Sequence, residues 1–288
     1  MNPSIDTDFL RGWVGREEVV ADHLTPALAE KFHATIDLPG DVARDGDVAP
    51  RLIHFCLCQP AVGMTALGED GHPARGGFLP PVPLPRRMWA ASEIVFTGDL
   101  RVGETVTRRS TVADVVVKNG RSGTLCFVTV DHAISGDRSG LVVQDRQTIV
   151  YRGLERASPT AQASAAPQGS TRATVRPTPT LLFRYSALTF NGHRIHYDQP
   201  YATQVEGYAG LVVHGPLQAT LLLHFAARLN SGQAPDRFSF RSNSTLFDRE
   251  DMVLHAGDLT MAGEGGSIAL WTARNDGPTA MQAEAHWL

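Results

Sequence analysis

The sequence has few of the residues that mark disulfide-rich, zinc-bound or membrane proteins. Its three cysteines are an odd number with no Cys-x-x-Cys pair, so neither a disulfide framework nor a zinc site is predicted. No apolar run reaches the ~18 to 20 residues that a membrane-spanning helix needs. The first twenty residues are acidic rather than basic and then apolar, unlike a secretory leader. We therefore expect a cytoplasmic protein in a reducing compartment, with no metal.

An excess of positive charge is also missing. The formal net charge is −4 and the isoelectric point is near 6.2, which gives no reason to expect nucleic acid or an anionic membrane as partner. Hydrophobic residues make up 42% of the chain and charged residues 19%, an ordinary globular composition. These values favour a globular protein that acts on a small molecule.

The chain of 288 residues is long enough for one large or two ordinary domains. Residues 156–179 are rich in Ala, Ser, Pro and Thr with almost no core-forming residues, which predicts a solvated linker. It would separate an N-terminal half, residues 1–155, from a C-terminal half, residues 180–288. Each half reads as a helix followed by antiparallel strands.

The first half has a clear helix start, with Thr25 as N-cap and Pro26 in the first helical position. Alternating apolar and polar residues then predict a meander of strands, with a strong hairpin signal at Asn119-Gly120. The expected strands of the two halves are 94–96, 105–117, 125–130 and 142–151, then 238–246, 252–261, 267–274 and 281–287. Residues 51–59 form an apolar run that suits either a strand or a buried helical turn, and residues 63–85 a rigid loop that either covers the sheet or lines a substrate site.

The most informative stretch is residues 183–229. Aromatic and polar residues alternate over 183–189 and predict a strand. A polar turn follows, in which Asn191 and His196 could converge on one point. A long apolar helix should begin at Gly215 or Pro216 and run to Leu229, because Leu, Leu, Phe and Leu recur every four residues. Its N-terminus could bind an oxyanion such as a polarised carbonyl oxygen.

Within this stretch, LTFNGHRIHYD resembles the motif of the MaoC-like, (R)-specific enoyl-CoA hydratases and dehydratases. Together with GGFLPPVPLPRRMWA in the first half, it is similar to a narrower branch: mesaconyl-C4-CoA (3-methylfumaryl-CoA) hydratases, itaconyl-CoA hydratases and mitochondrial-type 3-hydroxyacyl-thioester dehydratases. The resemblance covers roughly residues 20–288 and implies an α+β double hotdog, two antiparallel sheets each wrapped around a helix. The first half would be the acyl-binding, FAS1-like dehydratase half.

The resemblance implies catalytic roles for His196 and Asn191. His196 matches the family's catalytic histidine, whereas Asn191 stands where the family usually has an aspartate. Since an amide cannot take up a proton, proton handling would shift to His196, with His193 as an assistant. Taken alone, Asn191 would equally suit a turn. The first half shows no matching polar cluster after its helix, so one active site per chain is expected.

The remaining predicted site residues would bind substrate: His193, Arg194, His214, Gly215, Arg184, Tyr208, Arg86 and Arg87. Arg86 and Arg87 would lie near CoA phosphates, because arginine forks suit phosphate. Arg184 and Arg194 would bind a substrate carboxylate or else form solvated salt bridges. His193 and His214 would line the site or make structural hydrogen bonds.

The expected activity is that of a hydro-lyase, the reversible hydration of a 2-enoyl-CoA thioester, with a branched C5 dicarboxylyl-CoA as the favoured substrate. Coenzyme A would enter as part of the substrate, with no other cofactor, and a homodimer is allowed for. The alternatives are a general 3-hydroxyacyl-thioester dehydratase, a non-catalytic acyl-CoA-binding protein and, more weakly, a hotdog thioesterase.

Overall fold

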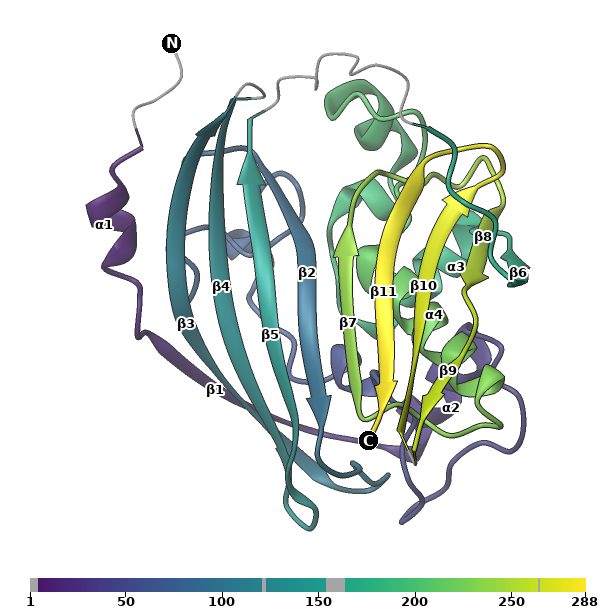
Figure 1. The fold of residues 1–288 in the computed structure, drawn as a ribbon. Coiled ribbons are helices and arrows are strands. Elements are labelled where there is room, and N and C mark those ends of the chain that lie inside the picture. The colour runs from purple at the N-terminus through teal and green to yellow at the C-terminus, as the bar shows by residue number, and fades with distance from the viewer. Residues whose placement is uncertain (1–4, 121–122, 154–163, 264) are drawn as a thin grey trace.

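The computed structural model describes residues 5–120, 123–153, 164–263 and 265–288. Its centre is one eleven-stranded antiparallel sheet, which Figure 1 shows from its convex side. The N-terminal elements are α1 (Thr7–Arg11), β1 (Glu17–His23), α2 (Pro26–Thr35), β2 (Arg86–Phe96), β3 (Thr105–Gly120), β4 (Gly123–Gly136) and β5 (Gly140–Arg152). The C-terminal elements are β6 (Thr171–Val175), α3 (Pro179–Leu188), α4 (Gly215–Leu229), β7 (Arg237–Ser242), β8 (Met252–Ala256), β9 (Thr260–Ala262), β10 (Gly265–Arg274) and β11 (Thr279–Trp287).

The two halves of the chain share this sheet. Its strand order is β1-β3-β4-β5-β2-β7-β11-β10-β8-β6, with β9 paired to β10, so every strand of the first half precedes every strand of the second. The halves join at β2 and β7, which pair from Ala91 opposite Arg241 to Val95 opposite Arg237. The expected double hotdog is therefore confirmed, and its two halves share one continuous sheet.

In the second half, α4 lies against the inner face of the sheet (Figure 1). It begins at Gly215, as predicted, and its fifteen residues span roughly 22 Å at 1.5 Å per residue. Leu217, Leu221 and Phe225, three of the residues that recur every four positions, are all buried. The helix thus forms because its apolar side chains cover the inner face of the C-terminal strands.

The first half has no comparable helix against its own strands among the described residues. Helix α2 forms where predicted, with the Thr25 hydroxyl accepting a hydrogen bond from the Leu28 N–H, but it packs against α3 of the second half. The Phe32 ring lies 6.1 Å from that of His224 on α4. The inner face of β2 to β5 is therefore left to line a cavity.

Two local predictions were wrong. Residues 183–189, expected as a strand, lie mostly in α3, where Thr178 caps the helix and Pro179 occupies its first turn. The short aromatic alternation gave way to this N-terminal helix signal. Within the predicted linker, Thr171–Val175 form β6, an edge strand paired with β8. Residues 154–163 of the linker lie outside the described residues, and the boundaries of the halves at 155 and 180 stay predictions.

The remaining expectations were resolved or confirmed. Within residues 51–59, Ile53–Cys56 form a buried 3₁₀ turn. Strands β3 and β4 form the hairpin expected at Asn119-Gly120, whose tip at 121–122 lies outside the described residues.

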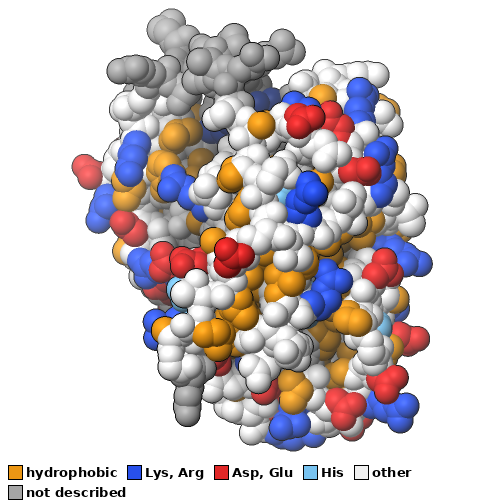
Figure 2. All heavy atoms as spheres, turned by 45° about the vertical axis from the view of Figure 1, so that its right-hand side comes forward, with side chains coloured by type: hydrophobic (Ala, Val, Ile, Leu, Met, Phe, Trp, Pro, Cys, Tyr) orange, Lys and Arg blue, Asp and Glu red, His pale blue; other side chains and the backbone are white. Residues whose placement is uncertain are grey.

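In the described part of the chain, no helix is both long and apolar enough to cross a bilayer. Figure 2 shows charges of both signs scattered over one face, with small hydrophobic groups between them.

Candidate active site

A cavity of about 1350 Å³ lies between the inner face of the first-half strands and the start of α4. Both halves line it. The second half contributes Asn191 and the imidazoles of His193, His196 and His214. The first half contributes the loop around His72 and inward-facing residues of β2 to β5. The residues that the sequence singled out therefore meet at one place, together with first-half residues that it did not single out.

Asn191 follows α3 in a tight turn. Phe190 has a positive φ of 47°, and the Asn191 N–H donates to the Ser186 carbonyl oxygen at 2.8 Å, which ends the helix. The Asn191 side-chain oxygen accepts a hydrogen bond from the His193 N–H at 3.0 Å. The amide nitrogen of Asn191 is thus the side-chain group left for a ligand, and it can only donate.

His196 stands in a short 3₁₀ turn, Arg194–His196, and is buried. Its Nδ1 lies 2.7 Å from the Val212 carbonyl oxygen. Because a carbonyl can only accept, Nδ1 carries the proton and Nε2 is a free base nitrogen. Burial lowers the pKa of His196 to about 4, so the imidazole is neutral near pH 7. This side chain can take up a proton.

His214 lies against His196. Their rings stack with centroids 3.7 Å apart and an interplanar angle of 18°. The Ser186 hydroxyl lies 2.8 Å from Nε2 of His214, and burial lowers the pKa of His214 well below its ordinary value. The neutral His214 ring, which Ser186 of α3 holds by a hydrogen bond, thus keeps the His196 ring in place.

The N-terminus of α4 opens into the same cavity. Its first residue, Gly215, lines the cavity, and a Cβ added there would meet only ordinary contacts, the nearest being Ser242 Oγ at 3.5 Å and the Trp89 carbonyl oxygen at 3.6 Å. Packing therefore does not require glycine, and its bare backbone leaves room for a ligand. Free N–H groups and the helix dipole make this a place for a partly negative oxygen.

The loop that carries Asp70 and His72 reaches this site from the first half. The Arg194 N–H donates to the Asp70 carbonyl oxygen at 2.9 Å, which joins the loop to the motif turn. The His72 and His193 rings lie with centroids 4.1 Å apart, and those of His193 and His196 lie 5.4 Å apart. The first half thus brings an aspartate and a histidine to this site, although its sequence holds no second copy of the Asn-His motif.

A further polar group lines the first-half end of the cavity, on the inner faces of β3, β4 and β5. The Ser110 hydroxyl lies 2.8 Å from His132 Nδ1, and His132 Nε2 lies 3.2 Å from the Gln147 side-chain oxygen. Burial raises the pKa of Asp145 to about 7. The guanidinium of Arg108 also lines this end, and its Nε has no hydrogen-bond partner among the described residues.

The predicted arginines separate into three groups. Arg86 and Arg194 are engaged within the protein: Arg86 pairs with Glu206 at 3.0 Å and lies over the Tyr208 ring, and Arg194 pairs with Asp198 at 2.8 Å. Arg184 is exposed on α3 and is not among the residues that line the cavity. Arg87 lines the cavity, as does Tyr208, and has no ion-pair partner within 4.0 Å in the described ranges.

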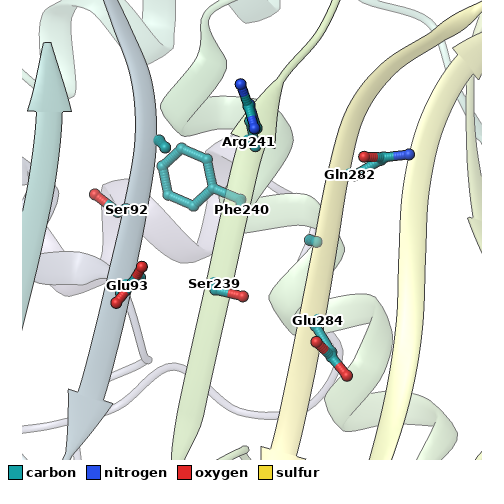
Figure 3. Close-up of a pocket in the computed structure, with 9 residues that line it drawn as sticks. Ser92, Glu93, Ser239, Phe240, Arg241, Gln282 and Glu284 are labelled. Atoms are coloured by element: carbon teal, nitrogen blue, oxygen red, sulfur yellow. The ribbon is translucent and has the colours of Figure 1, made fainter. Parts of the chain in front are cut away.

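A second depression, of about 290 Å³, crosses the outer side of the sheet at the β2, β7 and β11 junction (Figure 3). It shares no lining residue with the large cavity and holds no histidine or cysteine.

Sequence reasoning missed Asp70 and His72 because they lie more than a hundred residues before the motif that they contact. The available signal was a short Asp-Gly-His run within a loop rich in Gly and Pro.

Comparisons with known proteins show the family to which the chain belongs. The family profile of hydroxyacyl-thioester dehydratase type 2 matches residues 51–248. The chain is 42% identical over 273 residues to a mesaconyl-C(4)-CoA hydratase of Chloroflexus aurantiacus, covering 94% of this chain and 95% of the relative. It is 28% identical over 260 residues to a mitochondrial hydroxyacyl-thioester dehydratase type 2 of Schizosaccharomyces pombe, covering 80% of this chain and 86% of the relative.

Solved structures share the fold at low identity. A MaoC-like dehydratase from Phytophthora capsici matches with a TM-score of 0.68 and 15% identity, covering 99% of both chains. A Mycobacterium tuberculosis protein described as a double hotdog matches with a TM-score of 0.62 and 13% identity, covering 96% of both chains. The family match over most of the chain, the close curated relative and the double hotdog agree, and the protein belongs to the hydroxyacyl-thioester dehydratase type 2 family of MaoC-like hydro-lyases.

Proposed function

We propose that the protein catalyses the reversible hydration of a 2-enoyl-CoA thioester whose acyl group is a branched C5 dicarboxylate, such as 3-methylfumaryl-CoA (mesaconyl-C4-CoA) or itaconyl-CoA. The observation that carries this proposal is the free Nε2 of His196 in a cavity that also holds the bare N-terminus of α4. Hydration needs both: a base for water and a donor for the thioester oxygen.

In this mechanism the thioester carbonyl oxygen binds the backbone N–H of Gly215 at the start of α4. A donor of this kind contributes about 2.7 to 4 kcal/mol to transition-state stabilisation in enzymes where it has been removed. His196 Nε2 takes the proton from water as the water oxygen attacks the β-carbon. The Asn191 amide nitrogen donates to the same water, and the stacked ring of His214 keeps His196 from rotating away.

Arg87 is the side chain that we assign to the substrate's distal carboxylate. It lies on β2 within the wall of the cavity that His72 and His193 also line. A hydrogen bond between charged groups contributes about 1.5 to 3 kcal/mol. Support also comes from the identity to a mesaconyl-C(4)-CoA hydratase.

The depth of the cavity favours a second candidate, a dehydratase for a longer 3-hydroxyacyl thioester. Arg87 on β2 stands opposite Tyr151 on β5 in the strand register. Asp145 lies six residues before Tyr151 on the same strand, which at ~3.3 Å per residue puts about 20 Å between the two. Both Tyr151 and Asp145 line the cavity. That distance is much longer than a five-carbon acyl group, so the first-half end could accept an extended chain.

The test is the loss of ultraviolet absorbance of the enoyl thioester, measured with mesaconyl-C4-CoA, itaconyl-CoA, crotonyl-CoA and a long-chain 2-enoyl-CoA. Fast turnover of a dicarboxylyl substrate is expected. Turnover of only the long-chain substrate would select the second candidate. No turnover of any substrate would contradict both and favour a binding protein.

Variants of Arg87 and Arg184 sharpen the choice of substrate. Arg87→Gln should lower kcat/KM for the dicarboxylyl substrate by about 10- to 150-fold, the equivalent of the 1.5 to 3 kcal/mol above, with a much smaller effect on crotonyl-CoA. Arg184→Gln, on the exposed side of α3, is the matched control and should change neither substrate. Equal losses on both substrates for Arg87→Gln would discard the carboxylate assignment.

A further inference from the structure

In the motif that this turn resembles, an aspartate usually stands at the position of Asn191, and an amide cannot take up a proton. A carboxylate nevertheless reaches the imidazoles from the other half of the chain. We propose that Asp70 and His72 form an acid–base dyad that delivers a proton to the α-carbon of the substrate, an inference that rests on the proposed hydration. The dyad would replace, from the first half, the proton exchange that Asn191 cannot perform.

The geometry is that of an oriented imidazole. Asp70 Oδ2 lies 2.9 Å from His72 Nδ1, and Asp70 Oδ1 accepts the His72 backbone N–H at 3.0 Å. Both carboxylate oxygens are thus used to hold one residue. An ionised carboxylate accepts from Nδ1–H, so the base nitrogen of His72 is Nε2, and the carboxylate stabilises the imidazolium that forms when Nε2 gains a proton.

The charge states fit this role. Burial alone would raise the pKa of Asp70, but the hydrogen bonds from His72 outweigh it and hold the pKa below its ordinary value. Burial lowers the pKa of His72, while Asp70 opposes that shift. His72 is therefore a neutral base beside an anion near pH 7, whereas His196 has only a backbone carbonyl behind it.

The docking of the loop is specific. Gly71, between the two dyad residues, has a φ of +85°, and a Cβ added to it would lie 1.9 Å from the Gly192 carbonyl oxygen. The backbone N–H of Arg194 donates to the Asp70 carbonyl oxygen at 2.9 Å, and Arg194 Nη1 donates to the Glu69 carbonyl oxygen at 3.1 Å. Backbone of the motif turn and backbone of the loop thus touch directly, which fixes His72 beside His193.

The imidazoles of His72, His193 and His196 then make a continuous row through the cavity wall. In the hydration direction, the water oxygen bonds to the β-carbon, the water proton moves to His196 Nε2, and the π electrons form an enolate held at α4. The proton passes through His193 to His72 Nε2, and His72 then gives it to the α-carbon. One O–H and one π bond break, one C–O and one C–H bond form, and the enzyme returns to its starting state.

The experiment compares His72→Gln and Asp70→Asn with the intact enzyme on the best enoyl-CoA substrate. Loss of a general acid–base group costs about 10²- to 10⁴-fold in rate, so we expect this loss in kcat for His72→Gln with KM within about threefold. His255→Gln is the matched control, because His255 is buried beside Trp271 and does not line the cavity. It should leave kcat unchanged.

The pH profile separates an acid–base role from a structural one. The titratable and charged groups near His72 are Asp70, His193, His196, Arg75 and Arg87. In Asp70→Asn the carboxylate that supports protonation of His72 is gone, so the pKa of His72 falls further. The acid limb of kcat should then move to lower pH while the rate at its plateau falls. A merely structural role would lower kcat without moving the limb.

Three outcomes would overturn the dyad. The first is a His72→Gln enzyme within threefold of the intact kcat, and the second is an unmoved acid limb in Asp70→Asn. The third is activity that EDTA removes and Zn²⁺ restores, because Asp70, His72 and His193 each place a ligand-type atom within 4.8 Å of the others. If the intact protein turns over no enoyl-CoA at all, the proposed function fails. If the intact protein is active and the His72→Gln and Asp70→Asn variants keep the same kcat as the His255→Gln control, only the dyad fails.

Discussion

Substitution of Gly71 by alanine tests whether the contact between the loop and the motif turn is required for activity. The residue has a φ of +85°, a conformation that costs a non-glycine residue about 1 to 3 kcal/mol. In addition, the new Cβ would lie 1.9 Å from the Gly192 carbonyl oxygen, which is backbone and cannot rotate away. The loop must therefore separate from the motif turn, and Asp70 and His72 must move with it.

The magnitude follows from what is lost. Separation removes the hydrogen bond from the Arg194 N–H to the Asp70 carbonyl oxygen, worth about 0.5 to 1.5 kcal/mol net. Added to the backbone cost, the free energy of unfolding should fall by about 2 to 4 kcal/mol. The kcat of the folded enzyme should fall by about 10²- to 10⁴-fold, because the acid–base dyad has left the cavity.

The assay pairs this variant with Gly46→Ala. Gly46 has nearly the same φ, +86°, but an added Cβ meets nothing within 4 Å. The control should therefore lose the backbone part of the stability and keep its kcat. Denaturant unfolding and initial rates on the same samples give both quantities. A Gly71→Ala enzyme that is folded and as active as Gly46→Ala would refute the reasoning, since the loop would not need its position against Gly192.

Two further predictions concern the histidines. His196→Ala should reduce kcat by several orders of magnitude and Asn191→Ala by less, and equal mild losses in steady-state kinetics would contradict the roles of base and water-holding amide. Stability should fall on acidification, because burial lowers the pKa of His54 to about 3 and those of His132, His196 and His224 to about 4. Between pH 6.5 and about 4 the unfolded chain binds protons that the folded chain does not, which costs up to about 1.4 kcal/mol per pH unit for each group. A thermal midpoint that rises from pH 7 to pH 5 would contradict this sign.

Local signals in the sequence were enough for much of the fold. The Thr25-Pro26 start and the four-residue apolar repeat from Leu217 predicted α2 and α4, because both depend on neighbours along the chain. The long alternating strands of the first half were found for the same reason. Helix α3 was mistaken for a strand because aromatic and polar residue types alternate over residues 183–189. In the helix Phe183 is exposed and Tyr185 is buried, whereas in a strand the two would share one face.

The candidate site was predicted only where it is continuous in sequence. Asn191 and His196 lie in one motif, so the resemblance pointed to them. The position of Asp70 and His72 depends on how the first-half loop crosses to Gly192, a contact that no local pattern encodes. The pairing of the arginines was equally hidden, because Arg86 meets Glu206, which lies 120 residues later in the chain, whereas Arg87 meets no described carboxylate within ion-pair distance.

The pairing of β2 with β7 also has a consequence for biosynthesis. During translation β2 is complete long before β7 exists, so its backbone N–H and C=O groups on that side form an open sheet edge. Such an edge can pair with another chain, and the hollow inner face beside it would be exposed as well. The charged side chain of Glu93, in the middle of the paired segment, opposes such pairing. The nascent first half is therefore the species most prone to aggregate. The sheet and the cavity are completed only when the second half has been synthesised and has folded against β2.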